Sequence, residues 1–440
     1  MPTKIHRQLE TYISQRTSEL IDYVLEGGRL AVVKAPPGSG KTYLLMQCVK
    51  AARKANQRVA IATQTRAQSD DICRRLVSEF KVTPIRFAAN SATLNDSNFQ
   101  ITTNAKDLPS GPCVVVATSA KWGLVSHLSE FDVLFVDEAW QLAWADFMLL
   151  GQVSDRFILI GDPGQIPPVV SIDTSRWETS PRAPHHPAPE HILREPPRDL
   201  LSLDLPATRR LPADTVDFIK PFYNFPFKAF AQPGERIVEV QGKPRDGIDT
   251  ALDCLANGSV VALTLPTPPE GPPLEDDAEI AQLAVNVAKR LVHRDAKVNA
   301  GSGIQNIQPS DIGLCATHRV MNTAIELRLT QKLRRQMRVD TPERWQGLQL
   351  PVMIAVHPLS GVVHPSDFDL QTGRLCVMAS RHQAGLIIVT RDHIGDTLDT
   401  HLPLAEQPIG RPDISGQGHY QNTQFWNQLL KLDRVVVGAT

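Results

Sequence analysis

The sequence lacks several features that would assign it to a protein class at once. No apolar run approaches the roughly 18 to 20 residues that a membrane-spanning helix needs, so we expect no membrane association. The first residues, MPTKIHRQLETYISQR, contain no apolar stretch of the kind found in secretory signals. In a chain of 440 residues with 42% hydrophobic and 21% charged residues, these absences predict a soluble globular protein of the cytoplasm.

An excess of charge of one sign and paired cysteines are also missing. Lysine and arginine number 46 and aspartate and glutamate 47, which leaves a net charge of −1. The chain as a whole therefore has no net positive charge that could bind duplex DNA by electrostatic attraction alone. Binding of nucleic acid would need a local groove. The six cysteines form no CxxC pair, which argues against a zinc ribbon or a thioredoxin-type site. Scattered thiols indicate a reducing compartment.

Short apolar runs alternate with helical patterns in the first half of the chain. This alternation predicts an α/β fold with a mainly parallel sheet. The predicted strands are Leu30–Lys34, Arg58–Thr63, Cys113–Thr118, Val133–Val136 and Phe157–Ile160. The predicted helices cover residues 42–55, 67–79, 119–129 and 141–150.

The second half repeats this style. Its predicted strands are Val260–Leu265, Ile312–Ala316, Val352–Val356 and Leu386–Val389, and its predicted helices cover 276–293, 318–336 and 373–384. Two proline-rich segments, 181–197 and 266–273, predict extended surface loops because proline fixes φ and removes a hydrogen-bond donor. We therefore expect two tandem domains, 1–205 and 206–440, each a mainly parallel sheet flanked by helices, with a hinge near 200–206.

The strongest local motif is APPGSGKT, residues 35–42, which follows an apolar strand and opens a helix. This is the context of a phosphate-binding loop, in which glycines let backbone N–H groups close around phosphate oxygens. We expect the cradle to comprise Pro37, Gly38, Ser39, Gly40, Lys41 and Thr42. Lys41 would reach the β- and γ-phosphates, and the Thr42 hydroxyl would bind Mg²⁺. The alternative is a glycine-rich turn without a ligand.

A second motif places two carboxylates at the end of an apolar strand, in DVLFVDEAWQ at residues 132–141. Ligands of open α/β sheets bind at the carboxyl ends of the strands. We expect Asp137 to hold Mg²⁺ and Glu138 to act as the general base for the attacking water. A solvated pair of carboxylates is the alternative.

The stretch GDPGQIPPVV, residues 161–170, indicates which class of P-loop NTPase the chain resembles. It resembles motif III of superfamily 1 helicases, particularly their Upf-like and RecD-like branch. The resemblance implies that the bound nucleotide is ATP and that Gln165 senses its γ-phosphate. A neutral amide suits that role because it can hydrogen-bond both a phosphate oxygen and a water.

Further segments resemble the other motifs of this family in the right order. Residues 61–70 resemble motif Ia and residues 116–119 motif Ib, which implies that Thr65 and Thr118 contact the backbone of a nucleic acid. Residues 210–219 resemble motif IV, with Arg210 at the arginine position, and 316–319 resemble the TPxR turn of the second domain.

The C-terminal motifs complete the series, which spans about residues 30 to 390. Residues 339–349 resemble motif V, which implies that Thr341 and Trp345 lie beside the bound strand, with Trp345 as the candidate for stacking on a base. Gln349 stands where the family usually has glutamate and would bond the nucleotide's sugar hydroxyl. Residues 375–389 resemble motif VI, with Arg381 as an arginine finger.

The resemblance implies two RecA-like domains with ATP and Mg²⁺ as cofactors. It implies a monomeric ATPase that moves along single-stranded DNA or RNA from 5′ to 3′, with a protein partner for targeting. Gln8 and Gln15 are candidates for reading adenine. One alternative is an ATP-gated clamp or scaffold that binds nucleic acid without processive unwinding. A generic P-loop NTPase such as a GTPase is another, although the NKxD motif that reads guanine is missing.

Overall fold

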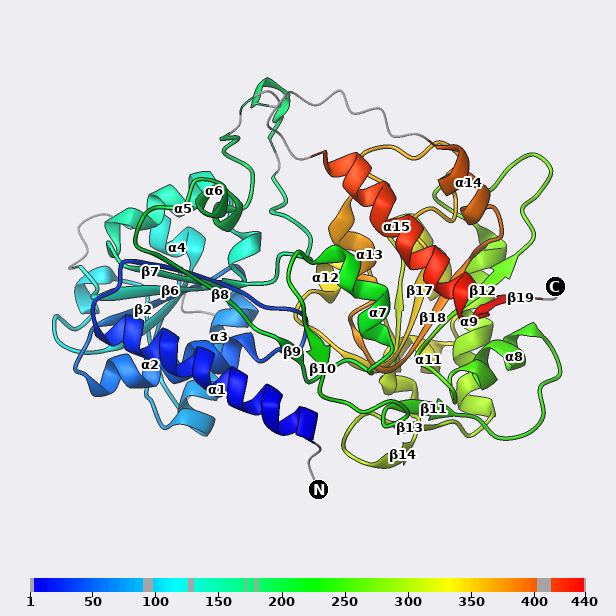
Figure 1. Cartoon of the computed structure of the whole chain (residues 1–440), viewed down its shortest axis with the longest axis horizontal. Coiled ribbons are helices and arrows are strands. Elements are labelled where there is room, and N and C mark those ends of the chain that lie inside the picture. The colour runs from blue at the N-terminus through cyan, green and yellow to red at the C-terminus, as the bar shows by residue number, and fades with distance from the viewer. Residues whose placement is uncertain are drawn as a thin grey trace. The chain divides into compact units, whose positions relative to one another are not determined.

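The computed structural model describes residues 4–89, 98–125, 130–170, 172–177, 180, 182–401 and 413–438. The chain divides into two compact units (Figure 1). The first unit comprises residues 1–163 and 167–207, and the second comprises residues 164–166 and 208–440. Each unit is built around its own parallel sheet.

The first unit contains an eight-stranded sheet in the order β4-β3-β5-β2-β6-β7-β1-β8. All neighbouring strands in it are parallel. The strands are β1 (Leu30–Lys34), β2 (Val59–Thr63), β3 (Ile85–Phe87), β4 (Gln100–Thr102), β5 (Val114–Thr118), β6 (Val133–Asp137), β7 (Phe157–Gly161) and β8 (Leu200–Asp204). This sheet confirms the α/β class predicted from the alternating pattern.

Helices cover both faces of this sheet (Figure 1). One face packs against α1 (Lys4–Leu25), α2 (Lys41–Lys54) and α3 (Arg66–Arg75), which a π-helical turn at Leu76–Phe80 extends. The other face packs against α4 (Ser119–Gly123), α5 (Trp144–Leu149) and α6 (Ala188–Arg194). Because both faces of the sheet are buried, strands such as β5 are continuous apolar runs and do not alternate apolar with polar residues.

The second unit contains a six-stranded parallel sheet in the order β16-β15-β17-β18-β12-β19. The strands are β12 (Val260–Leu265), β15 (Ile312–Cys315), β16 (Arg338–Asp340), β17 (Leu350–Val356), β18 (His382–Arg391) and β19 (Val435–Val437). Two small sheets accompany it. They contain β9 (Ala207–Thr208) with β10 (Lys228–Ala229), and β11 (Ile237–Glu239) with β13 (Lys297–Asn299) and β14 (Ile304–Asn306).

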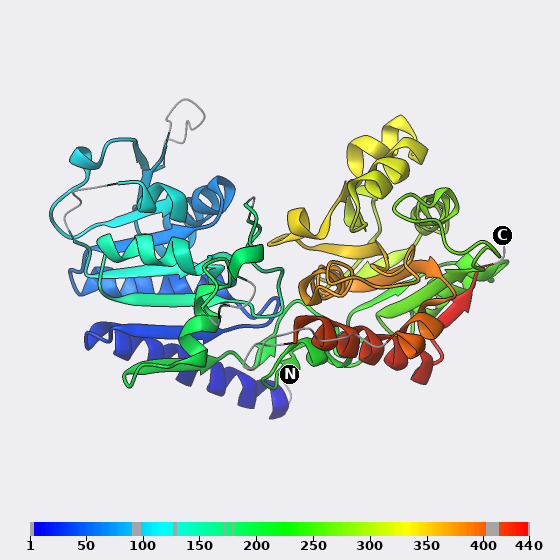
Figure 2. The same cartoon turned by 90° about the horizontal axis from the view of Figure 1, so that it is seen from above.

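Helices again cover both faces (Figure 2). One face packs against α8 (Gly247–Cys254), α9 (Ala278–His293) and α10 (Arg319–Arg328). The other packs against α7 (Thr215–Ile219), α13 (Thr372–Met378), α14 (Ile394–Thr400) and α15 (Ile414–Lys431). Two short helices belong to connections between strands of this sheet. Along the chain, α11 (Gln331–Gln336) precedes β16, and α12 (Pro342–Trp345) follows β16. Single 3-10 turns occupy connections at Ala105–Asp107, Ala139–Gln141, Leu150–Gln152, Ser175–Trp177, Lys220–Phe222 and Pro309–Asp311.

Several boundaries differ from those predicted. The proline-rich segment 181–197 is not simply an extended loop, because it contains α6, whose prolines lie at its start, where a missing N–H costs no helical bond. The expected hinge at 200–206 contains β8, which pairs with β1. The predicted helix 119–129 ends at Gly123, and residues 126–129 lie outside the described residues.

Two predicted helices of the second unit are also shorter than expected. The segment 318–336 is split into α10 and α11 at Thr330, whose hydroxyl caps the second helix by accepting a hydrogen bond from the Leu333 N–H. The helix expected at 373–384 ends at Met378, and β18 begins at His382. Within the described part of the chain, no helix is both long and apolar enough to cross a membrane. All six cysteines are free thiols.

Candidate nucleotide-binding site

The glycine-rich loop connects β1 to α2 in the first unit. Gly38 has φ 70° and Gly40 has φ 89°, in the left-handed region that favours glycine. A Cβ on Gly40 would meet no atom within 4 Å, so the requirement for glycine here is conformational and not steric. Gly40 gives α2 no side-chain cap, so the first N–H groups of this helix can meet an anion.

Lys41, the first residue of α2, lies between two carboxylates. Its Nζ is 3.4 Å from Glu138 Oε2 and 3.8 Å from Asp162 Oδ2. Glu138 follows β6 and Asp162 follows β7, so the ends of two neighbouring strands meet the start of the helix. The Ser39 hydroxyl beside Lys41 is buried and has no hydrogen-bond partner in the described residues. An orphaned hydroxyl in the loop fits a phosphate cradle.

Thr42 and Asp137 bring two oxygen donors together. The Thr42 hydroxyl donates to Asp137 Oδ2 at 3.4 Å, and the Glu138 backbone N–H donates to Asp137 Oδ1 at 3.0 Å. Burial raises the pKa of Asp137 to about 7, with a further rise from the Glu138 charge, while Lys41 opposes the shift. A bound cation would favour the ionised carboxylate.

The donor set suits Mg²⁺. This ion prefers oxygen ligands, and in nucleotide sites it is held by one or two protein groups together with phosphates. The described residues contain no group of three or more His, Cys, Asp or Glu side chains that could hold a metal by themselves. Thr42 and Asp137 would therefore hold the ion together with the substrate's phosphates.

The turn after β6 is strained. Glu138 has φ 50° and ψ 46°, a left-handed conformation that non-glycine residues rarely adopt and that is common at functional sites. On the neighbouring strand, a Cβ on Gly161 would lie 2.8 Å from the Ala139 nitrogen, so glycine is needed for this close approach. Sequence reasoning missed Asp162 as a partner of Lys41, although it stands directly after Gly161 in the quoted motif.

Gln165 belongs to the second unit rather than to the first. Residues 164–166 are assigned to that unit, and Gln165 is buried there. The close packing explains a glycine at the start of α13. A Cβ on Gly373 would lie 2.5 Å from the Ile166 nitrogen and 2.7 Å from the Gln165 carbonyl carbon.

Arg210 connects three motif segments of the second unit. Its Nε donates to Gln349 Oε1 at 2.5 Å, and its Nη1 donates to the Ser380 carbonyl at 3.2 Å. The Gln349 amide oxygen expected to meet a sugar hydroxyl is thus bonded to Arg210. The neutral side chain of Gln349 orients this arginine without neutralising it.

Arg381 is 1% exposed and belongs to the same unit. Its Nε donates to the Val377 carbonyl at 3.3 Å, whereas its Nη2 has no hydrogen-bond partner in the described part of the chain. A buried guanidinium nitrogen without an acceptor is costly. The orphaned nitrogen fits a group that meets an anion, as an arginine finger does.

The three threonines expected to contact nucleic acid differ in whether their hydroxyls cap a helix. Thr65 and Thr118 are helix caps whose hydroxyls accept hydrogen bonds from the backbone N–H groups of Gln68 and Lys121. Thr341 precedes α12 and makes no side-chain cap bond. Each hydroxyl of the two caps can still donate its own proton to a phosphate.

The expected stacking role of Trp345 is wrong. Trp345 is 1% exposed and lies in the hydrophobic core of the second unit. Its indole N–H donates to the Leu314 carbonyl at 3.2 Å, and its ring fills the space above Gly313. An aromatic ring enclosed in this way packs the sheet and offers no face to a base.

Known proteins match parts of this chain. The family model described as "AAA domain" matches residues 24–171, which include the glycine-rich loop and both carboxylate-bearing strand ends. DNA replication ATP-dependent helicase/nuclease DNA2 of Saccharomyces cerevisiae is 24% identical over 189 residues. That match covers 40% of this chain and 12% of the yeast protein, so the chain matches only a small part of its curated relative.

Solved structures also resemble the chain. An Arterivirus nonstructural protein 10 (helicase) has a TM-score of 0.44 at 16% identity, covering 86% of this chain and 64% of that one. The PRRSV helicase has a TM-score of 0.42 at 16% identity, with 84% and 54% covered. The two sequence matches are consistent with the resemblance of the motifs to superfamily 1 helicases and their Upf-like branch.

Proposed function

We propose that this chain is an ATP-dependent helicase or translocase with two RecA-like lobes that moves along single-stranded DNA or RNA from 5′ to 3′. The observation that carries the proposal is the cluster around Lys41, in which a helix start meets the carboxylate-bearing ends of two strands. The yeast relative is named as an ATP-dependent helicase and nuclease, which supports the helicase class. The 5′-to-3′ direction rests on the sequence motifs alone.

The first unit holds the triphosphate in this proposal. Backbone N–H groups at the start of α2 and the Lys41 ammonium bind the phosphates. Thr42 and Asp137 hold Mg²⁺, which neutralises charge on the phosphates when bound. Glu138 accepts the proton of the attacking water, and its strained backbone fixes its carboxylate beside Lys41.

The second unit supplies the groups that respond to ATP. Arg210 and Arg381 stabilise the charge that grows on the transferred phosphoryl group, and Gln165 orients the water. Because these groups and the glycine-rich loop belong to separate compact units, ATP can favour a closed arrangement and its hydrolysis an open one. Alternating contacts of Thr65, Thr118 and Thr341 with the strand would convert this cycle into movement. We propose a monomer in the cytoplasm that a protein partner directs to its substrate.

The test compares ATP hydrolysis with no nucleic acid, single-stranded DNA, single-stranded RNA and duplex. We expect stimulation by single strands, and duplexes with a 5′ tail should be unwound in preference to those with a 3′ tail. Stimulation without unwinding would instead identify an ATP-gated clamp or a pure translocase. Absence of ATP hydrolysis under all four conditions would contradict the proposal.

A further inference from the structure

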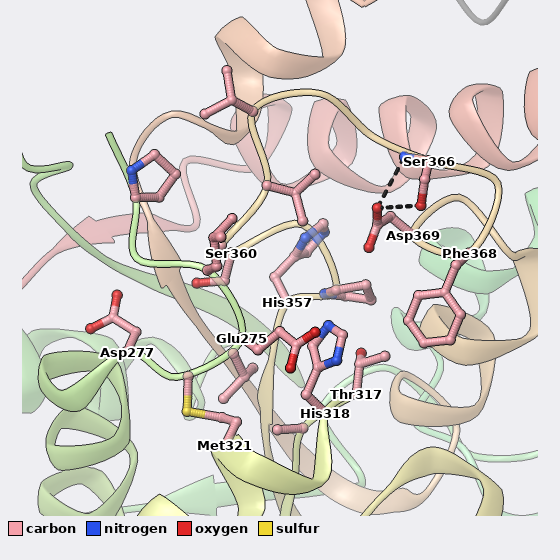
Figure 3. A pocket seen from close by; sticks show the side chains of 18 of the residues that line it. Glu275, Asp277, Thr317, His318, Met321, His357, Ser360, Ser366, Phe368 and Asp369 are labelled. Carbon is pink, nitrogen blue, oxygen red and sulfur yellow. Dashed lines mark hydrogen bonds between the residues drawn. The ribbon is translucent and has the colours of Figure 1, made fainter. Parts of the chain in front are cut away.

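A cavity of about 460 Å³ lies within the second unit, and its lining includes residues of the turn 316–319 that resembles the TPxR motif (Figure 3). Three segments form it, and each follows the carboxyl end of a strand. They are the loop 272–277 after β12, the turn 316–318 after β15 and the loop 356–369 after β17. Ligands of open α/β sheets bind at this edge.

Three polar groups of the cavity lining are buried and unsatisfied. The atoms are Thr317 Oγ1, His357 Nε2 and Ser360 Oγ, and none has a hydrogen-bond partner in the residues that the structure describes. His357 is 1% exposed and Ser360 is 4% exposed. Buried polar atoms are nearly always paired in folded proteins, so three orphans around one cavity point to a polar ligand.

The hydrogen bonds of His357 define what it offers to that ligand. Its Nδ1 accepts a hydrogen bond from the Leu359 N–H at 3.1 Å, so in the neutral ring the proton resides on Nε2. Burial, assisted by the neighbouring His393, lowers the pKa of His357 to about 3 and keeps the ring neutral. The cavity therefore presents one fixed N–H donor and two hydroxyls, which can donate or accept.

The charges around the cavity exclude an anion. Its lining contains Glu275, Asp277 and Asp369 and, as far as the structure describes the chain, no lysine or arginine. Asp277 is paired with Arg391 at 2.7 Å, and Asp369 accepts hydrogen bonds from Ser366 N and Oγ. Glu275 stands among the lining side chains in Figure 3 and can accept a hydrogen bond from a ligand. A phosphate would meet these carboxylates without a compensating cation.

The aromatic and apolar residues of the cavity lining can pack against a planar ring of a ligand. The rings of His318 and Phe368 lie 5.6 Å apart at 35°, and both line the cavity. Phe368 is supported from one side by the Arg374 guanidinium, 3.8 Å from its ring centre. Met321 and Val356 add apolar surface. The ligand should thus be planar and neutral, with an acceptor for His357 and donors for a carboxylate.

We propose that this cavity binds a nucleobase, whose ring carbonyls and amino groups provide this combination of acceptors and donors. The base can come from two sources, a free nucleoside or one base of a bound single strand. The second source rests on the proposed function, whereas the first does not. In either case the sugar and phosphate would remain outside the acidic lining.

The variant that tests this is Thr317→Val combined with Ser360→Ala, which removes the two orphaned hydroxyls with little change of volume. Because neither hydroxyl has a partner among the described residues, the melting temperature of the unliganded chain should stay the same or rise. Thr250→Val is the matched control, since it removes an exposed hydroxyl of α8 that bonds only the Asp246 carbonyl. A marked loss of melting temperature in the double variant, without one in the control, would show a structural role and overturn the proposal.

The first arm titrates uridine, cytidine, adenosine and guanosine into the full chain by calorimetry without ATP. We expect at least one nucleoside to bind, and the double variant to bind it about tenfold more weakly or worse, since two hydrogen bonds are lost. Ribose 5-phosphate is the control ligand and should not bind. Binding of ribose 5-phosphate that equals that of the nucleosides would contradict a base pocket.

The second arm compares a single-stranded oligonucleotide with an abasic strand of the same length, by affinity without ATP and by stimulation of ATP hydrolysis. If the base comes from the strand, the preference for the base-containing strand should shrink about tenfold in the double variant. If no nucleoside binds and both proteins discriminate equally, the pocket proposal fails while strand-stimulated hydrolysis still supports the helicase. If no strand stimulates hydrolysis but nucleosides bind as expected, the helicase proposal fails and the pocket stands.

Discussion

The cations that we propose to be functional have opposite surroundings in the two units of the chain. In the first unit, Lys41 lies within 3.8 Å of two carboxylates, Glu138 and Asp162, and is thus neutralised by its own surroundings. In the second unit, Arg381 is buried with one guanidinium nitrogen unsatisfied among the described residues. Its neighbour Arg210 donates to an amide and a carbonyl. The charge of Lys41 is thus already balanced within the first unit, whereas Arg381 keeps one nitrogen available for an anion.

A second buried arginine shows that the fold can pair such a group when structure alone requires it. Arg391, at the end of β18, bonds Asp277 at 2.7 Å and Glu279 at 2.7 Å. Arg381 directly precedes the same strand, and both arginines are buried. Among the described residues, the second unit satisfies Arg391 fully and leaves Nη2 of Arg381 unpaired, a difference that supports the proposed functional role of Arg381 and a structural one for Arg391.

Of the variants that test the contrast between Arg381 and Arg391, we expect Arg381→Met to change the rate of ATP hydrolysis most. Removal of an arginine finger lowers the rate of phosphoryl transfer by about 10³ to 10⁵. The free energy of unfolding should change by less than about 1.5 kcal/mol, because the methionine keeps the volume of the stem and removes an unsatisfied group. Single-turnover ATP hydrolysis and urea denaturation measure the two quantities.

Arg391→Met is the control for that measurement. It leaves Asp277 buried without its cation and should cost about 3 to 5 kcal/mol of unfolding free energy. The hydrolysis rate of the molecules that remain folded should be unchanged. If the two variants behaved alike in both assays, the distinction between a functional and a structural arginine would be lost.

On the first unit, Glu138→Gln should slow hydrolysis by about 10² to 10⁴, the usual contribution of a general base. The amide keeps the shape of the side chain but cannot accept the proton of the attacking water. Removing this charge also frees Lys41 from one of its two carboxylate partners, so ATP binding should be preserved or tightened. A fluorescent ATP analogue measures the affinity, and near-normal turnover would reject the assigned role.

Trp345→Ala examines whether Trp345 packs the hydrophobic core of the second unit or contacts a bound single strand. Truncation of a buried tryptophan should cost about 3 to 5 kcal/mol of unfolding free energy, because its indole fills the space beside Gly313. The affinity of folded molecules for a single strand should not change. Denaturation and fluorescence anisotropy are the measurements, and a loss of affinity with normal stability would restore the stacking hypothesis.

The same contrast explains what the sequence could predict. The site of the first unit depends on contiguous segments, each a strand end followed by a turn, so residues 35–42 and 137–138 could be identified from their order and composition. The parallel sheets followed from the alternation of apolar runs with helical patterns. These features are local, and local sequence determines them.

The second unit depends on contacts that are distant in sequence. The bond between Arg210 and Gln349 joins residues 139 positions apart, and no local pattern announces it. The motif residue Trp345 proved to be core because strand β15 passes under its ring, a fact that depends on the whole sheet. The prolines of 181–197 likewise suggested a loop, yet burial of Ala188 and Ile192 against the first sheet stabilises α6.

The units should also respond to pH with opposite signs. In the second unit, burial lowers the pKa of His357 and of His382 to about 3. Their contribution to stability is therefore complete above about pH 6.5 and declines as the pH falls toward 3, by up to about 1.4 kcal/mol per pH unit for each histidine. In the first unit, burial raises the pKa of Glu190 to about 7, so its contribution is complete below about pH 4.5 and declines as the pH rises toward 7.

Hydrogen-exchange protection factors, corrected for intrinsic rates, measure this difference. Between pH 7.5 and pH 5, protection should fall in β17 and β18 and rise in α6. Glu190→Gln is the control, because it should abolish the rise in α6 and leave the opposite response of the neighbouring His191, whose pKa is lowered by burial, with β17 and β18 unaffected. A parallel change in both units would show that these groups do not govern local stability.

The smallest effect concerns Thr65, where a structural and a functional role coincide. Its hydroxyl accepts from the Gln68 N–H at 3.2 Å, and Gln68 Oε1 accepts from the Thr65 N–H at 2.9 Å, which forms a capping box. Thr65→Ala should thus cost about 0.5 to 2 kcal/mol of unfolding free energy whether or not a strand binds there.

A matched pair of variants separates the two roles. Thr65→Asn and Thr65→Asp both cap a helix about as well as threonine does, so the melting temperature should be kept in each. Only the aspartate places a negative charge where we expect a phosphate, so only Thr65→Asp should weaken the binding of a single strand, and the loss should shrink as salt screens the repulsion. Anisotropy titrations at two salt concentrations measure this. If both variants bind the strand equally well, Thr65 is a cap alone, and the first unit must contact nucleic acid through other groups.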